Sequence, residues 1–225
     1  MMFTSMSGQD KLIYEAYISG NMQIWEKVMN EIKPTTDEEI LSLVNYQYGY
    51  IGWCIDQKKD SKANKYLESA EKMVDDLEDK DYQESTLLAY KAAFIGFQIG
   101  LKPVKAPFIG MRSLSFAEES VKLDPENYFS YLQLGNIDFY MPKVFGGSKS
   151  VAIGHYLKSL ELIERDKQQL AYNWNYLSIL ATIIDAYYQI GEYEKAEEYC
   201  KKTLSIEPDF LWVKNTLYPK ITKEL

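Results

Sequence analysis

The sequence predicts an all-α protein built as an α-solenoid of stacked antiparallel helix hairpins. Apolar residues recur at the three- and four-residue spacing of amphipathic helices, and the 19 tyrosines fall inside these periods. The seven prolines and twelve glycines gather between the periodic segments, where they end helices. An even series of helices with short links is typical of a solenoid, in which neighbouring hairpins share one continuous core.

In the first half of the chain, each predicted helix has a start or stop signal. Gly20 ends the first helix, and Pro34 follows the second. Thr36 or Asp37 is expected to cap a long third helix, because a side-chain oxygen there can accept a hydrogen bond from a free backbone N–H. The predicted helices cover residues 10–19, 24–32, 37–55, 60–74 and 87–97, with a charged separator at 75–81.

The second half continues the series after an expected loop at residues 100–107. One helix ends at Asp124-Pro125, and the last hairpin closes at Glu207-Pro208. The hairpin between them is interrupted by residues 141–147, after which Ser148 is the predicted N-cap. A terminal helix over residues 210–225 is expected to be interrupted near Pro219.

The last hairpin carries a specific pattern. Gly191 stands at the turn, where a positive φ costs glycine little, and Ala196 is a small residue that lets two helices approach closely. The pattern is completed by Tyr187, Tyr193, Leu204 and Pro208, and the preceding hairpin repeats it in Tyr131, Leu134, Gly135, Ala152, Tyr156 and Leu160. The chain resembles the tetratricopeptide-repeat family over nearly its whole length. The resemblance implies a right-handed superhelix, with a Sel1-like solenoid as the alternative.

The resemblance also implies a domain organisation. A single solenoid domain is expected over residues 9–225, after a disordered or signal-remnant segment at residues 1–8. Its units are expected at roughly 9–34, 36–80, 81–125, 126–168 and 169–208, followed by a capping helix at 209–225. The turn around Pro142 and Phe145 resembles one found in bacterial tetratricopeptide proteins outside the cytoplasm, including solenoid partners of substrate-binding proteins in tripartite transporters.

Composition argues against several classes of function. A net charge of -8 disfavours nucleic acid, since few cations would displace its counterions. No apolar run reaches the roughly 18 residues of a membrane span. His155 and the cysteines Cys54 and Cys200 are too few for a Cys/His zinc cluster, and no catalytic motif is present. We therefore predict no catalytic residue, no metal and no cofactor, and hence a protein that is not an enzyme.

The cellular location has two interpretations of about equal weight. Met1–Gly8 is uncharged and ends in small residues, and Ser5 and Ser7 fit a small-x-small cleavage pattern, as in the tail of a secretory signal. The other interpretation is the frayed N-terminus of a cytoplasmic protein. The two cysteines lie far apart within helical patterns, and we expect them to be buried free thiols.

Function is expected on the concave surface, which first helices line in tetratricopeptide arrays. If the first helices of this chain line the same surface, the resemblance implies an aromatic groove without a basic clamp. The groove would be formed by Tyr46, Tyr50, Trp53, Tyr90, Phe97, Phe129, Asn136, Phe139, Tyr140, Phe145, Asp185 and Tyr188. Phe145 is expected to fold over the groove edge near Phe139 and Tyr140. Aromatic side chains offer large contact area at low entropy cost, which favours a protein or peptide partner.

Two other functions stay open. The first is an extracytoplasmic solenoid that binds a small hydrophobic ligand, as a transport accessory protein; a closed apolar pocket would favour it. The second is an enzyme that uses His155 with a nearby carboxylate; a buried His155–carboxylate pair in a cleft would favour that one.

Overall fold

The computed structural model describes residues 7–225, and within them every regular element is helical, as predicted. None of these helices is long and apolar enough to cross a membrane. Short 3₁₀ turns lie at Pro103–Lys105, Lys143–Phe145 and Lys167–Leu170, and a π-helical turn at Val213–Leu217. The α-helices are α1 (Ser7–Ser19), α2 (Met22–Glu31), α3 (Asp37–Asp56), α4 (Asp60–Glu78), α5 (Glu84–Leu101), α6 (Ala106–Leu123), α7 (Tyr128–Tyr140), α8 (Lys149–Ile163), α9 (Trp174–Gln189), α10 (Tyr193–Ile206) and α11 (Tyr218–Ile221).

Two predicted N-caps are confirmed. At α3 the Thr36 hydroxyl accepts a hydrogen bond from the Glu39 backbone N–H (3.2 Å), and the Glu39 carboxylate accepts one from the Thr36 N–H (3.3 Å). This reciprocal capping box satisfies donors that have no partner inside the helix. At α8 the Ser148 hydroxyl accepts from the Val151 N–H.

Three predicted boundaries are wrong. α1 begins at Ser7, before the expected start at residue 10, while residues 1–6 of the expected disordered segment lie outside the described part of the chain. α4 extends through the first part of the charged separator to Glu78. The expected loop at 100–107 is mostly helical: α5 ends at Leu101 and α6 begins at Ala106. Pro107 stands in the first turn of α6, where its missing N–H costs no helical hydrogen bond.

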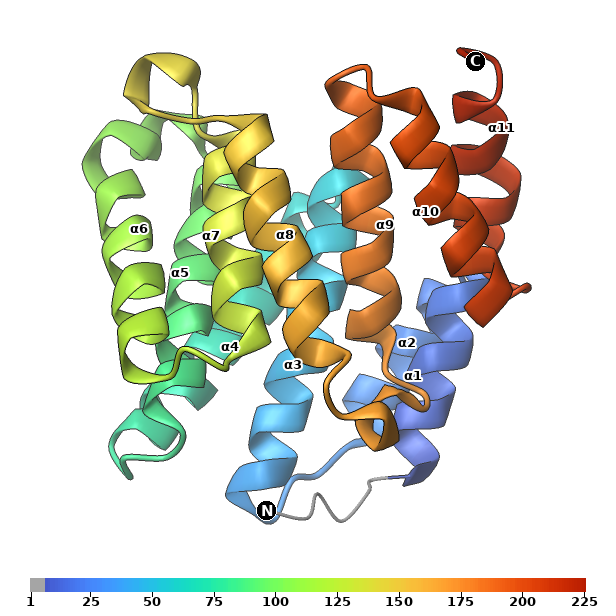
Figure 1. Cartoon of the computed structure of the whole chain (residues 1–225). Helices are drawn as coiled ribbons and strands as arrows, with labels where there is room; N and C mark the ends of the chain where they lie inside the picture. The colour runs from blue at the N-terminus through green and yellow to red at the C-terminus, as the bar shows by residue number, and fades with distance from the viewer. Residues whose placement is uncertain (1–6) are drawn as a thin grey trace. The chain divides into compact units, whose positions relative to one another are not determined.

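The chain forms two compact units. The central unit is Glu26–Leu134, and the terminal unit is made of residues up to Trp25 together with Gly135–Leu225. In the central unit, α3 packs on α4, and α5 packs on α6, α4 and α3. Figure 1 shows α5 and α6 side by side as an antiparallel hairpin. Cys54 of α3 is buried, and this burial raises the pKa of its thiol to about 11.

The terminal unit is built around α9, which packs against α8 and α10. Figure 1 shows α9 and α10 as neighbouring helices. Gly135 and Ala196 are buried, as predicted for the small residues at helix contacts. Cys200 of α10 is also buried, and burial raises its pKa to about 12. Both thiols are free, and their raised pKa values keep them protonated at neutral pH, which makes them poor nucleophiles.

An aromatic contact in the terminal unit joins the two ends of the chain. The Tyr17 ring of α1 lies 5.7 Å from the Trp174 ring and 5.1 Å from the Phe210 ring, measured between centroids. Trp25 packs edge-on against Trp174 at 5.1 Å. Because each repeat of a linear solenoid contacts only its neighbours, this contact between α1 and α9 departs from the expected arrangement.

Candidate functional site

Four aromatic rings meet in the central unit, and we call them the aromatic cluster: Tyr48 of α3, Tyr90 and Phe97 of α5, and Phe129 of α7. The Tyr48 ring is at the centre, with its centroid 5.3 Å from Phe97, 5.1 Å from Phe129 and 6.1 Å from Tyr90. Tyr90 and Phe129 are buried at 4% exposure each, whereas Tyr48 and Phe97 are half-buried. The two half-buried rings therefore present aromatic surface on a buried aromatic base.

Two glycines lie at the contact between α3 and α5 beside these rings. A Cβ built on Gly52 of α3 would lie 3.8 Å from Cε1 of Phe97, so the Phe97 ring rests directly against the backbone of α3. One helical turn further along both helices, a Cβ built on Gly100 of α5 would lie 3.6 Å from Cγ2 of Ile55 of α3. Both separations are ordinary van der Waals contacts, so α3 and α5 pack against each other on the side where Tyr48 and Phe97 stand, and an alanine would fit at either position.

Polar groups fix the edges of the cluster. The Tyr90 hydroxyl donates a hydrogen bond to Oδ1 of Asn45 (3.2 Å), and Nε2 of the buried Gln133 donates to the Tyr48 hydroxyl (3.3 Å). Burial raises the pKa of Tyr90 well above its ordinary value, and the neighbouring tyrosines Tyr128 and Tyr48 act in the same direction. The Tyr90 phenol is therefore neutral at physiological pH, which suits stacking and hydrogen bonding better than proton transfer.

The three groove residues predicted on α3 lie outside the aromatic cluster. Tyr46 and Tyr50 are buried, at 2% and 1% exposure, and offer no surface to a partner. The Tyr50 ring packs edge-on against Tyr66 of α4 at 5.2 Å, inside the α3–α4 hairpin. Trp53 is half-buried beside Tyr50, and the Lys59 ammonium lies 4.4 Å from the centre of the Trp53 ring. The prediction that Tyr46 and Tyr50 line an accessible groove is therefore wrong, because this face of α3 packs into the interior.

In the terminal unit, two predicted residues belong to a partly polar strip. The half-buried Phe139 has the Lys149 ammonium 5.1 Å from its ring centre. Lys149 donates a hydrogen bond to Gln189 Oε1 (2.5 Å), and Gln189 donates to Asp185 Oδ2 (2.6 Å). The exposed Tyr140 packs edge-on against Phe139 at 5.0 Å. A cation and an amide thus cover part of this surface, which makes it less apolar than the aromatic cluster.

The remaining predicted residues are dispersed. Asn136 is half-buried and accepts a hydrogen bond from the Tyr156 hydroxyl (3.0 Å). The Tyr188 ring has the Lys220 ammonium 3.8 Å from its centre. Phe145 is 68% exposed, so the expected packing of this ring over a groove edge is not observed. Its turn is tight instead, since Gly146 has a φ of 103° and a Cβ on Gly147 would lie 1.8 Å from the Met141 carbonyl oxygen.

His155 does have a carboxylate partner. Its Nε2 atom lies 3.3 Å from Oδ2 of Asp138, and both side chains are partly exposed, at 30% and 23%. Burial raises the pKa of Asp138, and the neighbouring His155 acts in the opposite direction. The pair joins α7 to α8 across the face of the hairpin. A partly exposed pair differs from the buried one that would favour an enzyme.

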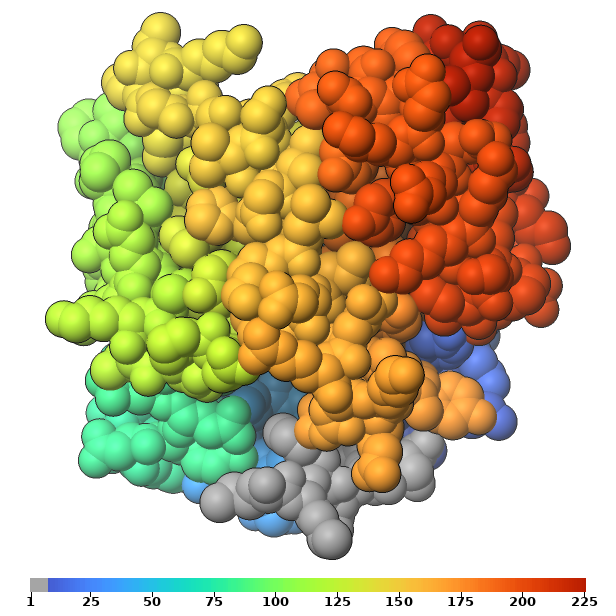
Figure 2. Space-filling model, in the orientation of Figure 1, coloured from blue at the N-terminus to red at the C-terminus, as the bar shows by residue number. Residues whose placement is uncertain are grey.

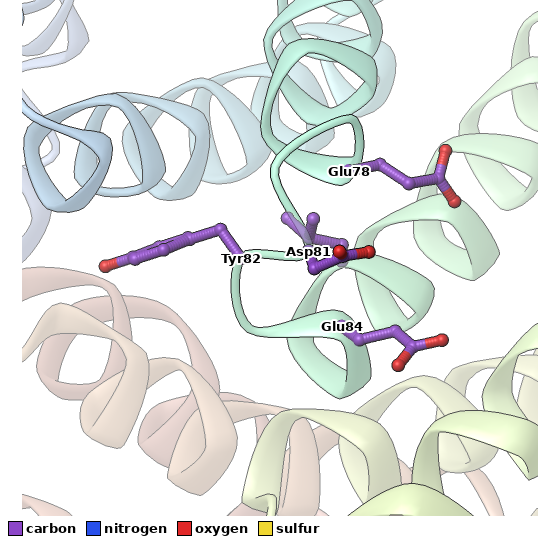
Figure 3. A pocket seen from close by; sticks show the side chains of 5 residues that line it. Glu78, Asp81, Tyr82 and Glu84 are labelled. Carbon is purple, nitrogen blue, oxygen red and sulfur yellow. The ribbon is translucent and has the colours of Figure 1, made fainter.

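A small hollow lies at the α4–α5 connection. Glu78, Asp81, Tyr82, Glu84 and Leu87 line an open space of about 280 Å³. Figure 3 shows the Glu78 and Glu84 carboxylates extending to one side of the connection, with the Tyr82 ring on the opposite side. Glu78 also forms an ion pair with Lys91. Within residues 7–225, no group of three or more His, Cys, Asp or Glu side chains is placed to hold a metal ion. The hollow is thus acidic and open, unlike an apolar ligand pocket.

Sequence reasoning missed the central residue of the cluster and its polar neighbours. Neither Tyr48 nor its neighbours Asn45 and Gln133 are among the groove residues that the sequence predicts. One usable signal was a polar asparagine three residues before Tyr48, followed by Gly52 four residues after it. At these spacings the three residues share a helix face, a combination suited to close contact around a tyrosine.

Comparison with known proteins shows a likeness of fold. No family model matches the chain, and no curated protein matches it. Among solved structures, the chain is similar to the HusA haemophore from Porphyromonas gingivalis, with a TM-score of 0.60 over 84% of this chain and 96% of that chain. The two sequences are 14% identical, so the likeness concerns the fold.

Proposed function

We propose that this protein binds a small, planar and largely apolar ligand, and that the ligand stacks on the aromatic cluster. The observation that carries this proposal is the half-buried pair Tyr48 and Phe97, held above the buried rings of Tyr90 and Phe129. Aromatic contacts are worth about 0.5–1.5 kcal/mol each beyond the burial of area. Several such contacts on a fixed base favour a rigid, flat ligand.

The fold likeness supports the same class of ligand. A haemophore carries haem, which is a planar, largely apolar macrocycle, and HusA is a helical protein of similar fold. We therefore place haem first among the ligands to test. A protein or peptide partner, expected from the sequence, takes second place, because Tyr46 and Tyr50 of the proposed groove are buried.

We also propose that the helix pairs are tetratricopeptide-like hairpins. The packing of α3 on α4, α5 on α6 and α9 on α10 supports this, as do the buried Gly135 and Ala196. The positive φ of Gly191 (81°) matches the turn expected of such a repeat. In this proposal the right-handed repeat is modified by the contact of α1 with α9.

Titration with haemin, followed through the Soret absorption band, tests the proposed function. Saturable binding is expected for the wild-type protein. Tyr48→Ala should weaken it by about tenfold or more, equivalent to about 1.4 kcal/mol, because the central ring of the cluster is lost. The matched control is Trp53→Ala on the same helix, whose half-buried ring contacts Tyr50 and Lys59 instead.

The control should bind haemin within about twofold of wild type. Circular dichroism of both variants establishes that they are folded. Absence of saturable binding to the wild-type protein would contradict the proposed function. Equal weakening by both variants would contradict the proposed location.

A further inference from the structure

The connection between α5 and α6 carries the most exposed apolar side chains of the central unit. We call residues 102–112 the α5–α6 tip. Within it, Val104 is 80% exposed, Phe108 85% and Met111 68%. Single exposed apolar residues are ordinary on protein surfaces, but three large ones within eight positions form a patch. Figure 2 shows green atoms of this part of the chain at the surface, at the upper left.

The three side chains lie on consecutive helical turns of the tip. Val104 lies in the 3₁₀ turn, and Phe108 and Met111 lie in the first turns of α6. Phe108 and Met111 are three residues apart on α6 and therefore share a face of this helix. Pro103 and Pro107 fix φ at two positions of the tip, which limits how far the backbone can rearrange to bury the patch.

The charge around the patch is opposite to that of the protein. The chain has a net charge of -8, yet no acidic residue occurs between Glu84 and Glu118. The tip itself contains three cations, Lys102, Lys105 and Arg112, whereas Lys91 of the same stretch pairs with Glu78. Lys102 and Arg112 are exposed and flank the apolar patch on both sides.

We propose that the α5–α6 tip docks on an anionic phospholipid surface, with Val104, Phe108 and Met111 entering the interface and Lys102, Lys105 and Arg112 contacting lipid phosphates. Apolar side chains surrounded by cations are the composition that binds the boundary between headgroups and acyl chains. A negative membrane surface attracts nearby lysine and arginine side chains, whereas the rest of this acidic protein is repelled by it. The charge reversal at the tip therefore selects both the partner and the orientation.

Sedimentation with lipid vesicles tests the proposal on the full chain. Vesicles of phosphatidylglycerol and phosphatidylcholine in equal parts should pellet the protein, and vesicles of pure phosphatidylcholine should pellet far less. The triple variant Val104→Ser/Phe108→Ser/Met111→Ser should lose most of the pelleted fraction. The charge variant Lys102→Glu/Lys105→Glu should also lose it, and added salt should weaken wild-type binding.

The matched control is Leu211→Ser/Trp212→Ser, because these residues are 41% and 46% exposed but follow the acidic residues Glu207 and Asp209. This control should pellet like the wild type. Failure of the wild type to pellet with anionic vesicles, or equal pelleting of the triple variant, would overturn the proposal. So would equal binding to pure phosphatidylcholine, since the cations would then have no role.

Tryptophan fluorescence tests the same proposal without the serine variants, which could fail to fold. Phe108→Trp retains a large ring at the most exposed position of the tip. Brominated lipids in anionic vesicles should quench the added tryptophan emission, beyond the quenching seen for the wild type. No added quenching would place residue 108 outside the bilayer and overturn the proposal.

Discussion

At the scale of single residues, Gly135 shows how a missing side chain fixes a helix contact. A Cβ at this position would lie 2.4 Å from Cε1 of Tyr156 and 3.2 Å from the Ala152 carbonyl oxygen. The Tyr156 ring is fully buried, and its hydroxyl is held by Asn136. The ring therefore cannot move aside without losing packing and a hydrogen bond.

Gly135→Ala should accordingly destabilise the protein by about 1–3 kcal/mol through overpacking. Gly154→Ala on α8 is the matched control, because that glycine is exposed and nothing lies within 4 Å of its added Cβ. The control should stabilise the protein by up to about 1 kcal/mol, since alanine favours a helix interior. Urea unfolding curves measure both effects. Equal stability of the two variants would show that α7 and α8 are not in close contact here.

At the scale of elements, Glu26 ties α2 to α4 within the central unit. Its carboxylate lies 2.6 Å from the Lys62 ammonium and accepts a hydrogen bond from the Tyr66 hydroxyl (3.1 Å). Burial acts to raise the pKa of Glu26, but the hydrogen bonds from Lys62, Tyr50 and Tyr66 together outweigh it. The pKa therefore lies below its ordinary value in the folded protein. The ionised form thus stabilises the fold at neutral pH, and this contribution is lost as the pH falls through the folded pKa.

Glu26→Gln should reduce the free energy of unfolding by about 1 kcal/mol at neutral pH. The difference from wild type should narrow as the pH falls from the ordinary pKa of 4.5 to the lower pKa of the folded protein, because the folded carboxylate is protonated only below that lower pKa. Glu31→Gln on the same helix is the control, since its 3.8 Å pair with Lys27 is largely exposed. Thermal unfolding across the pH range measures both. A Glu26→Gln deficit that stays constant down to low pH would contradict an ionic contribution.

Element boundaries could be predicted where the signal is local. The sequence predicts caps at Thr36 or Asp37 and at Ser148, and the structure has them at Thr36 and Ser148, because a cap residue and its backbone partner are only three positions apart. The sequence predicts a loop at 100–107 because Gly100, Pro103 and Pro107 are typical helix breakers, and this prediction is wrong. Proline ends a helix from its interior but is tolerated in its first turn, and only the position of the following helix distinguishes the two cases.

The site was harder to predict because it depends on helix register. Tyr46 and Tyr50 are four residues apart and share a face of α3, while Tyr48 lies on the opposite face. All three are equally aromatic, so composition does not tell which face packs inside the hairpin. That choice depends on contacts with α4 and α5, which are distant in sequence.

At the scale of the whole molecule, segments from near both ends of the chain build the terminal unit together. The buried Phe210 near the C-terminus packs against Tyr17 near the N-terminus, and Tyr14 donates a hydrogen bond to Glu207 (2.8 Å). Both contacts lie within the terminal unit. They indicate that α1 and the C-terminal segment unfold together, whereas distant repeats of a linear solenoid are independent.

A double-mutant cycle of Tyr17→Ala and Phe210→Ala tests this coupling. The two substitutions should show an interaction free energy of about 0.5–1.5 kcal/mol, because each removes one partner of the same ring contact. Chemical denaturation of the two single variants and the double variant supplies the cycle. Strictly additive effects would show that the chain ends do not cooperate.

The central claim is that a planar apolar ligand stacks on the aromatic cluster. Its most direct test is proton–nitrogen correlation NMR of the labelled protein, titrated with diamagnetic gallium protoporphyrin. The account predicts that backbone shifts concentrate around Tyr48, Phe97 and Phe129 on α3, α5 and α7. Shifts concentrated around His155 and Asp138 instead, or no saturable shifts at all, would contradict it.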